Sequence, residues 1–201
     1  IYRLSVTDNN GATAADTVSV TVNPAPSSTL TLVSWNAVWK YLDNGSDQST
    51  AWRASSFSDG TWASGPAVLG YGDPGVATII SYGSNSSAKY ITSYFRKQFN
   101  FSNPSAYAGV TLNMRRDDGA IVYVNGTEVY RTNMPTGAVT YITAASTAAA
   151  DDGAGIFTTN IPISAFATGT NTIAVEVHQS AGTSSDLVFD MEMVARDSSS
   201  L

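Results

Sequence analysis

The stretch RRDDGAIVYVNGTEVYRTNMP, residues 115–135, decides the fold of most of this 201-residue chain. Residues 120–124, before Asn125-Gly126, form a short continuous apolar run bounded by turn residues, which is the pattern of a buried β-strand, and residues 127–132 follow as a second strand. Asn and Gly both accept the positive φ angles of a type I′ turn, so this pair predicts a tight hairpin. The Asp-Asp-Gly triplet at 117–119 predicts another tight turn that leads into the first of the two strands.

Further stretches follow the same pattern, and turn sequences such as DDG, NG, GTN and AGTSS separate them. The chain shows no helical periodicity and no alternation of strands with helices, so we expect an all-β fold, an antiparallel β-sandwich or jelly roll. Residues 36–88 and 133–154 lack a strand pattern and are expected as long loops, which commonly bind ligands or ions. The predicted strands cover residues 31–35, 90–101, 108–116, 120–126, 127–132, 155–163, 171–179 and 185–195.

The beginning of the chain differs from the rest. Residues 1–23 alternate around the turn Asp8–Gly11 and predict a terminal β-hairpin. Residues 24–31 are rich in Pro and Ser and predict a linker. The sandwich domain is expected over 32–196, followed by a frayed tail at 197–201. Because a strand pattern begins at once and no signal peptide is visible, we expect a piece excised or processed from a longer protein.

Composition excludes several classes of function. The chain has no cysteine and one histidine, His178, so it has no disulfide framework, no thiol nucleophile and no His-rich metal site. The net charge of −6 argues against nucleic-acid binding, and no apolar run approaches the ~18 residues of a membrane span. Six of the ten basic residues nevertheless lie within 89–131, beside three acidic ones. That window indicates either a basic face for an anionic ligand or arginines paired with local carboxylates.

Two motifs resemble the galactose-binding-like jelly-roll domains that also occur as sugar-binding domains of glycoside hydrolases. The hairpin is similar to their pattern DDG..(V/I)Y(V/L)NG.EV.R, and IPISAFATGTNTIAVEVHQ at 161–179 resembles their strand L..G.N.IAVEVHQ. The resemblance extends over about 35–195 and includes the aromatic, Gly-rich stretch at 39–73. It implies an accessory module of a large secreted bacterial protein, and such modules commonly bind carbohydrate.

The N-terminal hairpin resembles a different family. Its pattern Y.LSVTDNNGATA.DTVSVTV is similar to the last two strands of a polycystic-kidney-disease-type (PKD) repeat, an immunoglobulin-like spacer of secreted bacterial proteins. Two strands cannot bury a sandwich core alone, so we expect an ordered remnant of such a repeat. Both resemblances imply a bacterial protein that is secreted or displayed at the cell surface.

Carbohydrate binding requires exposed aromatic rings that stack on sugars and planar polar groups that bond to hydroxyls. Trp39, Trp52 and Trp62 are expected to be core or loop anchors, whereas Tyr71 is expected at the surface because glycines flank it. The predicted ligand-binding residues are Tyr71, Arg96, Arg116, Asp117, Asp118, Arg131, His178, Gln179 and Asp186. The alternative is an Arg–Asp network that closes a polar sheet face without a ligand.

Catalysis is not expected. The candidate carboxylate pairs of a glycosidase are Asp117/Asp118, Asp151/Asp152 and Glu176/Asp186. Neighbouring aspartates on a turn usually diverge or serve one cation, and no nucleophile elbow G-x-S-x-G accompanies His178. Glu176 remains open as a buried ion-pair partner, a cation ligand or a site residue.

Calcium is the predicted structural cofactor, because Asp-rich loops with Gly and Asn offer hard oxygen ligands. The segment YLDNGSDQS at 41–49 carries such residues at close spacing. The jelly-roll resemblance implies one calcium between an early loop and the last strand, which makes Asp43, Asp47 and Glu192 the predicted ligands. The alternative is that these aspartates form simple Asx-turns.

The sequence therefore predicts a monomeric, non-catalytic module that binds a polysaccharide or oligosaccharide. The basic window favours an acidic or sulfated glycan. The other partners expected are covalently linked catalytic or adhesion domains of the parent protein. Two alternatives remain, a structural or adhesive spacer with no glycan ligand and a fragment of a hydrolase whose catalytic domain lies outside this chain.

Overall fold

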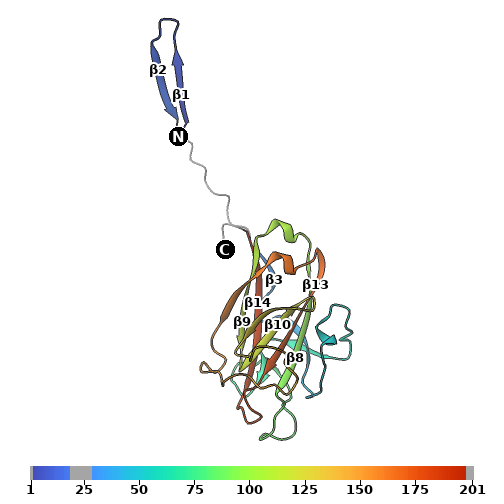
Figure 1. Cartoon of the computed structure of the whole chain (residues 1–201). Coiled ribbons are helices and arrows are strands. Elements are labelled where there is room, and N and C mark those ends of the chain that lie inside the picture. Colours follow the sequence, from blue (N-terminus) through green and yellow to red (C-terminus); the bar gives the residue numbers. More distant parts are fainter. Residues whose placement is uncertain (1, 19–28, 198–201) are drawn as a thin grey trace.

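The computed structural model describes residues 2–18 and 29–197 (Figure 1). Strands β1 (Tyr2–Thr7) and β2 (Thr13–Val18) pair antiparallel and form their own two-stranded sheet. Leu4 and Val6 are 68% and 59% exposed, as expected for two strands that have no core of their own. The end of the predicted hairpin at 19–23, most of the predicted linker and the tail at 198–201 lie outside the described residues.

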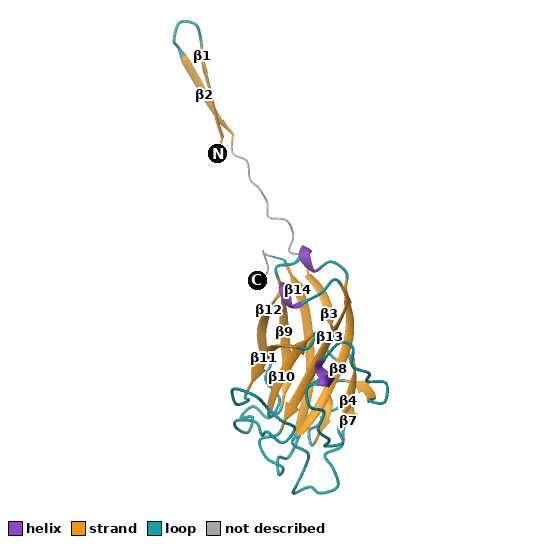
Figure 2. Cartoon of the chain, turned by 45° about the vertical axis from the view of Figure 1, so that its right-hand side comes forward, coloured by secondary structure: helices purple, strands orange, loops and turns teal. Residues whose placement is uncertain are grey.

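The remaining strands form a β-sandwich, which confirms the all-β prediction (Figure 2). One sheet has the order β11 (Thr127–Thr132), β10 (Gly119–Val124), β13 (Gly169–His178), β8 (Thr92–Phe101), β4 (Val38–Leu42), β5 (Ala63–Pro66). The other has the order β12 (Phe157–Pro162), β9 (Gly109–Arg116), β14 (Leu187–Arg196), β6 (Leu69–Tyr71), β7 (Thr78–Ile79), and β3 (Thr29–Val33) also pairs with β14. Neighbours pair antiparallel except β6 and β7, which are parallel.

The main hydrophobic core lies between the two sheets. Alternating residues of the long strands point inward, such as Phe95 of β8 and Phe189 of β14, whose rings stack at 4.3 Å between centroids. The fully buried Trp39 of β4 packs edge-on against Phe189 at 5.0 Å. This packing confirms the prediction that Trp39 is a core anchor.

A second apolar cluster covers the outer face of the β8/β13 sheet. Trp52 of the 3₁₀ helix η1 (Ala51–Arg53) and Trp62 pack there against Tyr94 and Tyr123. Both faces of this sheet are therefore covered, which explains why all six residues of β10 are buried. The two remaining 3₁₀ turns, η2 (Pro104–Ala106) and η3 (Ile163–Ala165), lie in connections between strands.

The prediction that residues 36–88 lack strands is wrong. The segment holds β4, β5, β6 and β7 besides η1. These strands have only two to five residues and include glycines at 65 and 70, so alternation is too brief to be recognised in the sequence. Gly70 is required by packing, because a Cβ there would lie 1.8 Å from the carbonyl oxygen of Leu187.

The hairpin between β10 and β11 has the predicted turn. Asn125 and Gly126 have φ angles of 51° and 88°, as a type I′ turn requires. The Asn125 side chain also accepts a hydrogen bond from the backbone N–H of Thr172 at 3.0 Å. The turn therefore connects the hairpin to the neighbouring strand β13 as well as closing it.

Candidate functional site at the loop end of the sandwich

Several strand ends meet at one end of the sandwich, where the long loops gather at the bottom of Figure 2. The pairing registers place the end of β9 beside the start of β14, and the start of β10 beside the end of β13. Asp117 and Asp118 join β9 to β10, and residues 179–186 join β13 to β14. We call this region the loop end, and it brings together Tyr71, Arg116, Asp117, Asp118, Gln179 and Asp186 of the predicted site.

Asp118 is buried and saturated with hydrogen bonds. Its Oδ1 accepts from the backbone N–H of Ala149 at 2.6 Å, and its Oδ2 accepts from the backbone N–H of Ser180 at 2.7 Å and from Ser184 Oγ at 3.1 Å. Burial favours the protonated acid, but hydrogen bonds from Asp117 and from these backbone groups outweigh it and lower the pKa of Asp118. Asp118 is therefore an ionised anchor that holds two loops in place.

Asp117 differs from its neighbour. Burial, followed by side-chain hydrogen bonds shared with Asp186 and with Asp118, raises the pKa of Asp117 to about 9. Two adjacent aspartates thus occupy opposite protonation states at neutral pH. The two side chains do not diverge as expected for neighbouring aspartates on a turn, because their carboxyl groups share a hydrogen bond.

Tyr71 lies in β6 and is only 5% exposed, so the expectation that it is a surface platform is wrong. Its hydroxyl accepts a hydrogen bond from Gln179 Nε2 at 2.9 Å, and the same nitrogen donates to the backbone oxygen of Asp186 at 2.7 Å. Burial raises the pKa of Tyr71 to about 12, so the phenol stays neutral. The flanking glycines mark close backbone approach, because a Cβ at Gly72 would lie 2.6 Å from Asp186 Cβ.

Arg116 lies at the end of β9 and opens onto a pocket. It is 5% exposed, its Nη2 donates to Thr132 Oγ1 at 3.3 Å, and its guanidinium carbon lies 3.7 Å from the ring centroid of Phe157. Its Nε and Nη1 have no hydrogen-bond partner in the described part of the chain. The pocket has a volume of about 660 Å³ and is lined by Arg116, Asn133, Thr147, Ala148, Ala149, Ala150, Asp151, Gly155, Ile156 and Phe157.

Arg96, a predicted ligand-binding residue, lies away from the loop end. It points outward from β8 and is fully buried beneath residues 52–59. Its Nε forms an ion pair with Asp59 Oδ2 at 2.9 Å, and its Nη atoms donate to the backbone oxygens of Trp52, Ala54 and Phe57. The Arg96 side chain therefore holds this loop onto the sheet. This agrees with the alternative prediction, in which an Arg–Asp network closes a polar sheet face without a ligand.

Arg131 and His178 also lie apart from the pocket. Arg131 makes two hydrogen bonds of 2.8 Å to Glu128 on the surface of β11. His178 Nδ1 lies 2.7 Å from the backbone oxygen of Thr143, and its Nε2 lies 3.4 Å from Glu176. Glu176 Oε1 forms an ion pair with Arg53 Nη2 at 3.3 Å. Of the three roles that the sequence left open for Glu176, the structure therefore shows that of a buried ion-pair partner.

The predicted calcium ligands Asp43, Asp47 and Glu192 do not form a cluster within the described ranges. Asp43 Oδ2 accepts from the backbone N–H of Ser81 at 2.5 Å, and Asp47 Oδ1 accepts from that of Ser49 at 2.7 Å. Glu192 Oε2 accepts from Asn113 Nδ2 at 3.1 Å on the strand surface. Asp47 follows the Asx-turn alternative, and the predicted grouping of three ligands is wrong.

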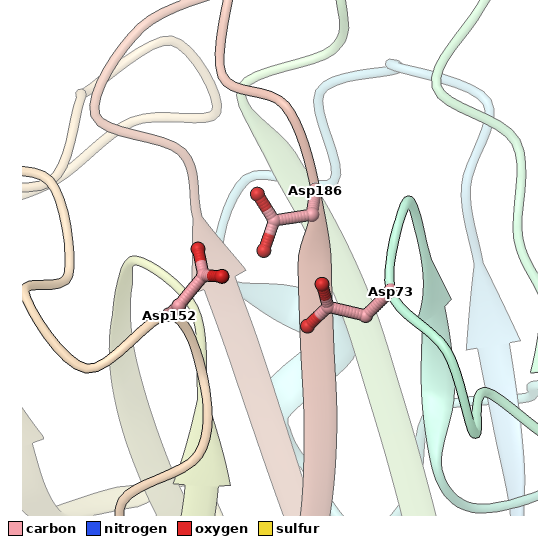
Figure 3. A group of neighbouring side chains, drawn as sticks. All are labelled: Asp73, Asp152 and Asp186. Carbon is pink, nitrogen blue, oxygen red and sulfur yellow. The ribbon is translucent and has the colours of Figure 1, made fainter.

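A different set of carboxylates does converge at the loop end (Figure 3). Asp73, Asp152 and Asp186 present oxygen atoms that all lie within 4.8 Å of one another. Sequence reasoning missed Asp73 and Asp152 as partners of Asp186, since they come from separate loops. The sequence does contain one indication of these positions. Asp73 and Asp152 each stand next to a glycine, Gly72 and Gly153, and both glycines have a positive φ angle at a sharp bend of the chain.

Comparison with known proteins shows the fold. The sequence matches no protein-family model and no curated protein. Similar solved structures include a calcium-binding mutant of β-glucuronidase 2 from Bacteroides uniformis, with 16% identity and a TM-score of 0.52 over 85% of this chain and 18% of that chain. A β-glucuronidase from glycoside hydrolase family 2 shows 14% identity and a TM-score of 0.52 over 89% of this chain and 18% of its own. A β-glycosidase from Bacteroides vulgatus shows 17% identity and a TM-score of 0.52 over 84% and 20%.

This chain therefore spans roughly one fifth of the length of these glycosidases. At such identities the likeness establishes a β-sandwich of a kind that occurs as one part of a glycosidase. Among the residues that the structure describes, no helix has the length and apolar character needed to cross a membrane.

Proposed function

We propose that this sandwich is a non-catalytic carbohydrate-binding domain of a larger secreted or cell-surface bacterial protein that acts on polysaccharide or adheres to it. The solved neighbours support a setting in carbohydrate-active proteins, because the same fold makes up 18–20% of their chains. The PKD-like hairpin supports linkage to further domains. We place the glycan site in the Arg116 pocket.

The observation that carries this proposal is the state of Arg116. Within the described residues, two of its nitrogens lack acceptors although the side chain is almost fully buried. Burial lowers the pKa of Arg116 and the facing Asp151 raises it, yet a guanidinium stays charged in proteins. A buried charge without partners is costly, so the pocket favours a ligand that supplies acceptors.

The pocket also suits a sugar in size and chemistry. Its volume of about 660 Å³ lies in the range of ordinary ligand pockets. Asp151 and Thr147 line the wall with groups that bond to hydroxyls, and Ile156 adds an exposed apolar surface. A carboxylate or sulfate on the glycan would pair with Arg116 through two hydrogen bonds, so acidic glycans are the favoured class.

Affinity electrophoresis in gels that contain a soluble polysaccharide tests the proposal. We expect a uronate-rich or sulfated polysaccharide to retard the chain more than a neutral one, and Arg116→Ala to abolish the retardation. Arg3→Ala is the matched control, because it removes one exposed positive charge from the hairpin, remote in sequence from the pocket. Retardation by none of the polysaccharides would overturn the proposal and favour a spacer domain.

A further inference from the structure

The loop end holds a second feature that the glycan pocket does not use. Asp73 follows β6, Asp152 lies in the connection between β11 and β12, and Asp186 immediately precedes β14. Figure 3 shows their carboxylates pointing toward one another from three separate segments. Their oxygens lie within 4.8 Å of one another although like charges repel at this distance.

The geometry of Asp186 supplies a second, independent observation. The residue is 5% exposed, and its Oδ1 accepts a hydrogen bond from Ser185 Oγ. Its Oδ2 is buried and, in the part of the chain described, accepts no hydrogen bond from an N–H or alcohol group, so the Asp117 carboxyl is the neighbour with which Asp186 shares a proton. A buried carboxylate oxygen without such a donor or a cation is costly, and this one belongs to a residue of the carboxylate cluster.

The nearby charges do not balance the cluster. The positive charge of Arg115 attracts the Asp73 carboxylate, and Arg115 Nε donates a hydrogen bond to the backbone oxygen of Gly153 at 3.1 Å. One arginine therefore faces several carboxyl groups, and the region has excess negative charge.

We propose that Asp73, Asp152 and Asp186 bind one divalent cation of the calcium type. Calcium takes carboxylate oxygens at about 2.3–2.6 Å, so two oxygens on one ion lie up to about 5 Å apart. Magnesium requires shorter bonds and usually retains most of its waters with only one or two carboxylates. Three carboxylates from separate segments therefore suit calcium better, and this site differs from the one that the sequence suggested at Asp43, Asp47 and Glu192.

The cation connects the three segments that meet at this end. Asp152 is followed by Gly153, where a Cβ would lie 2.9 Å from Val188 of β14, so this bend already packs closely on that strand. Asp152 is preceded by Asp151, which lines the Arg116 pocket and accepts from the backbone N–H of Gly155 at 2.8 Å. A cation held by Asp152 consequently fixes one wall of the pocket. This last consequence rests on the proposed glycan site, whereas cation binding itself does not.

The test is calcium titration by isothermal calorimetry of the full chain after EDTA treatment, together with thermal unfolding in calcium, magnesium or EDTA. We expect one calcium per chain and a melting temperature several degrees higher in calcium than in EDTA, with a smaller shift in magnesium. The calcium titration contains no glycan, so the absence of calcium binding would not contradict the proposed glycan site. Equally, the absence of retardation in the glycan gels would not contradict the proposed calcium site.

Asp152→Asn and Asp47→Asn form a matched pair of variants. Both residues are exposed, both are aspartates in loops, and Asn tolerates the positive φ of 51° at residue 152. Asp152→Asn should weaken calcium binding at least tenfold and remove the melting shift while leaving the circular dichroism spectrum unchanged. Asp47→Asn should bind calcium like the parent. Absence of calcium heat in the parent, or loss of binding in Asp47→Asn alone, would overturn the proposal.

Discussion

Two buried arginines of the same basic window, Arg96 and Arg116, have opposite surroundings. Arg96 lies under the loop that covers the outer face of the β8/β13 sheet and has four acceptors, the Asp59 carboxylate and three backbone oxygens. Arg116 lies at the loop end with one hydroxyl acceptor, one aromatic ring and, among the described residues, two nitrogens without partners. The two side chains are buried to nearly the same extent, so they differ in how many of their N–H groups have a hydrogen-bond acceptor.

The difference shows how a structural charge is distinguished from a candidate binding charge. A buried group whose hydrogen bonds are all made stabilises the fold, because every partner belongs to the chain. A buried group with unmade bonds costs stability unless a ligand completes it. The same criterion separates Asp118, which accepts from three N–H or hydroxyl donors, from Asp186, whose Oδ2 accepts from no such donor among the described residues.

The largest effect on stability is expected from Arg96→Ala. Removal of the guanidinium leaves Asp59 and three backbone oxygens without their donor, and breaking a buried pair costs about 3 kcal/mol or more. Urea denaturation should show this loss in the free energy of unfolding, and the emission of Trp52 and Trp62 should shift to the red as the loop detaches. A variant as stable as the parent would show that the loop does not depend on Arg96.

A smaller effect is expected from Tyr123→Phe on the same outer face. The Tyr123 hydroxyl donates to Glu176 Oε1 at 2.6 Å, and a hydrogen bond to a buried charged group contributes about 2 kcal/mol. Arg53 still pairs with Glu176 in the variant, so the carboxylate keeps part of its compensation. Chemical denaturation measures the difference, and a loss as large as that of Arg96→Ala would contradict this ranking.

Arg116→Ala should change stability little, by no more than about 1 kcal/mol, because the lost contacts are offset by removal of buried donors without partners. Glycan retardation in affinity gels should nevertheless disappear. The combination of a near-normal unfolding midpoint with lost binding is the signature of a ligand-binding arginine. If the variant unfolds as readily as Arg96→Ala, Arg116 is a structural residue and the comparison between the two arginines fails.

The smallest effect is expected from Arg131→Ala. Arg131 pairs with Glu128 in a partly exposed position, where an ion pair contributes less than about 1 kcal/mol. Thermal unfolding and glycan retardation should both remain close to the parent. A strong loss of glycan binding would show that the whole basic window, rather than the Arg116 pocket, holds the ligand.

Much of the fold follows from the sequence alone. Alternation over eight to ten residues identifies β8, β9, β13 and β14, and Asn125-Gly126 determines the hairpin between β10 and β11 through its backbone preference. The short strands β4 to β7 were missed because two to five residues do not establish a period. They form by pairing with longer neighbours such as β8 and β14, which a local pattern cannot show.

Only part of the candidate site can be predicted from the sequence. Asp117, Asp118, Gln179 and Asp186 do lie close together, because they follow or precede strand ends that the sandwich brings side by side, and their role in ligand binding stays a prediction. Arg96 was misplaced, since alternation assigns a residue to a face of its strand without showing which loop covers that face. Tyr71 was expected outside because its glycines suggested an open turn, although they permit close packing.

The sequence by itself determined the class of fold, the hairpin turn and the absence of thiol chemistry, because these depend on residue type and on spacing along the chain. The tertiary structure decided which charges are satisfied. Asp73, Asp152 and Asp186 are separated by long stretches of chain and meet only through the packing of loops at one sandwich end. Whether a buried charge has partners depends on distances between such segments, and no local pattern encodes them.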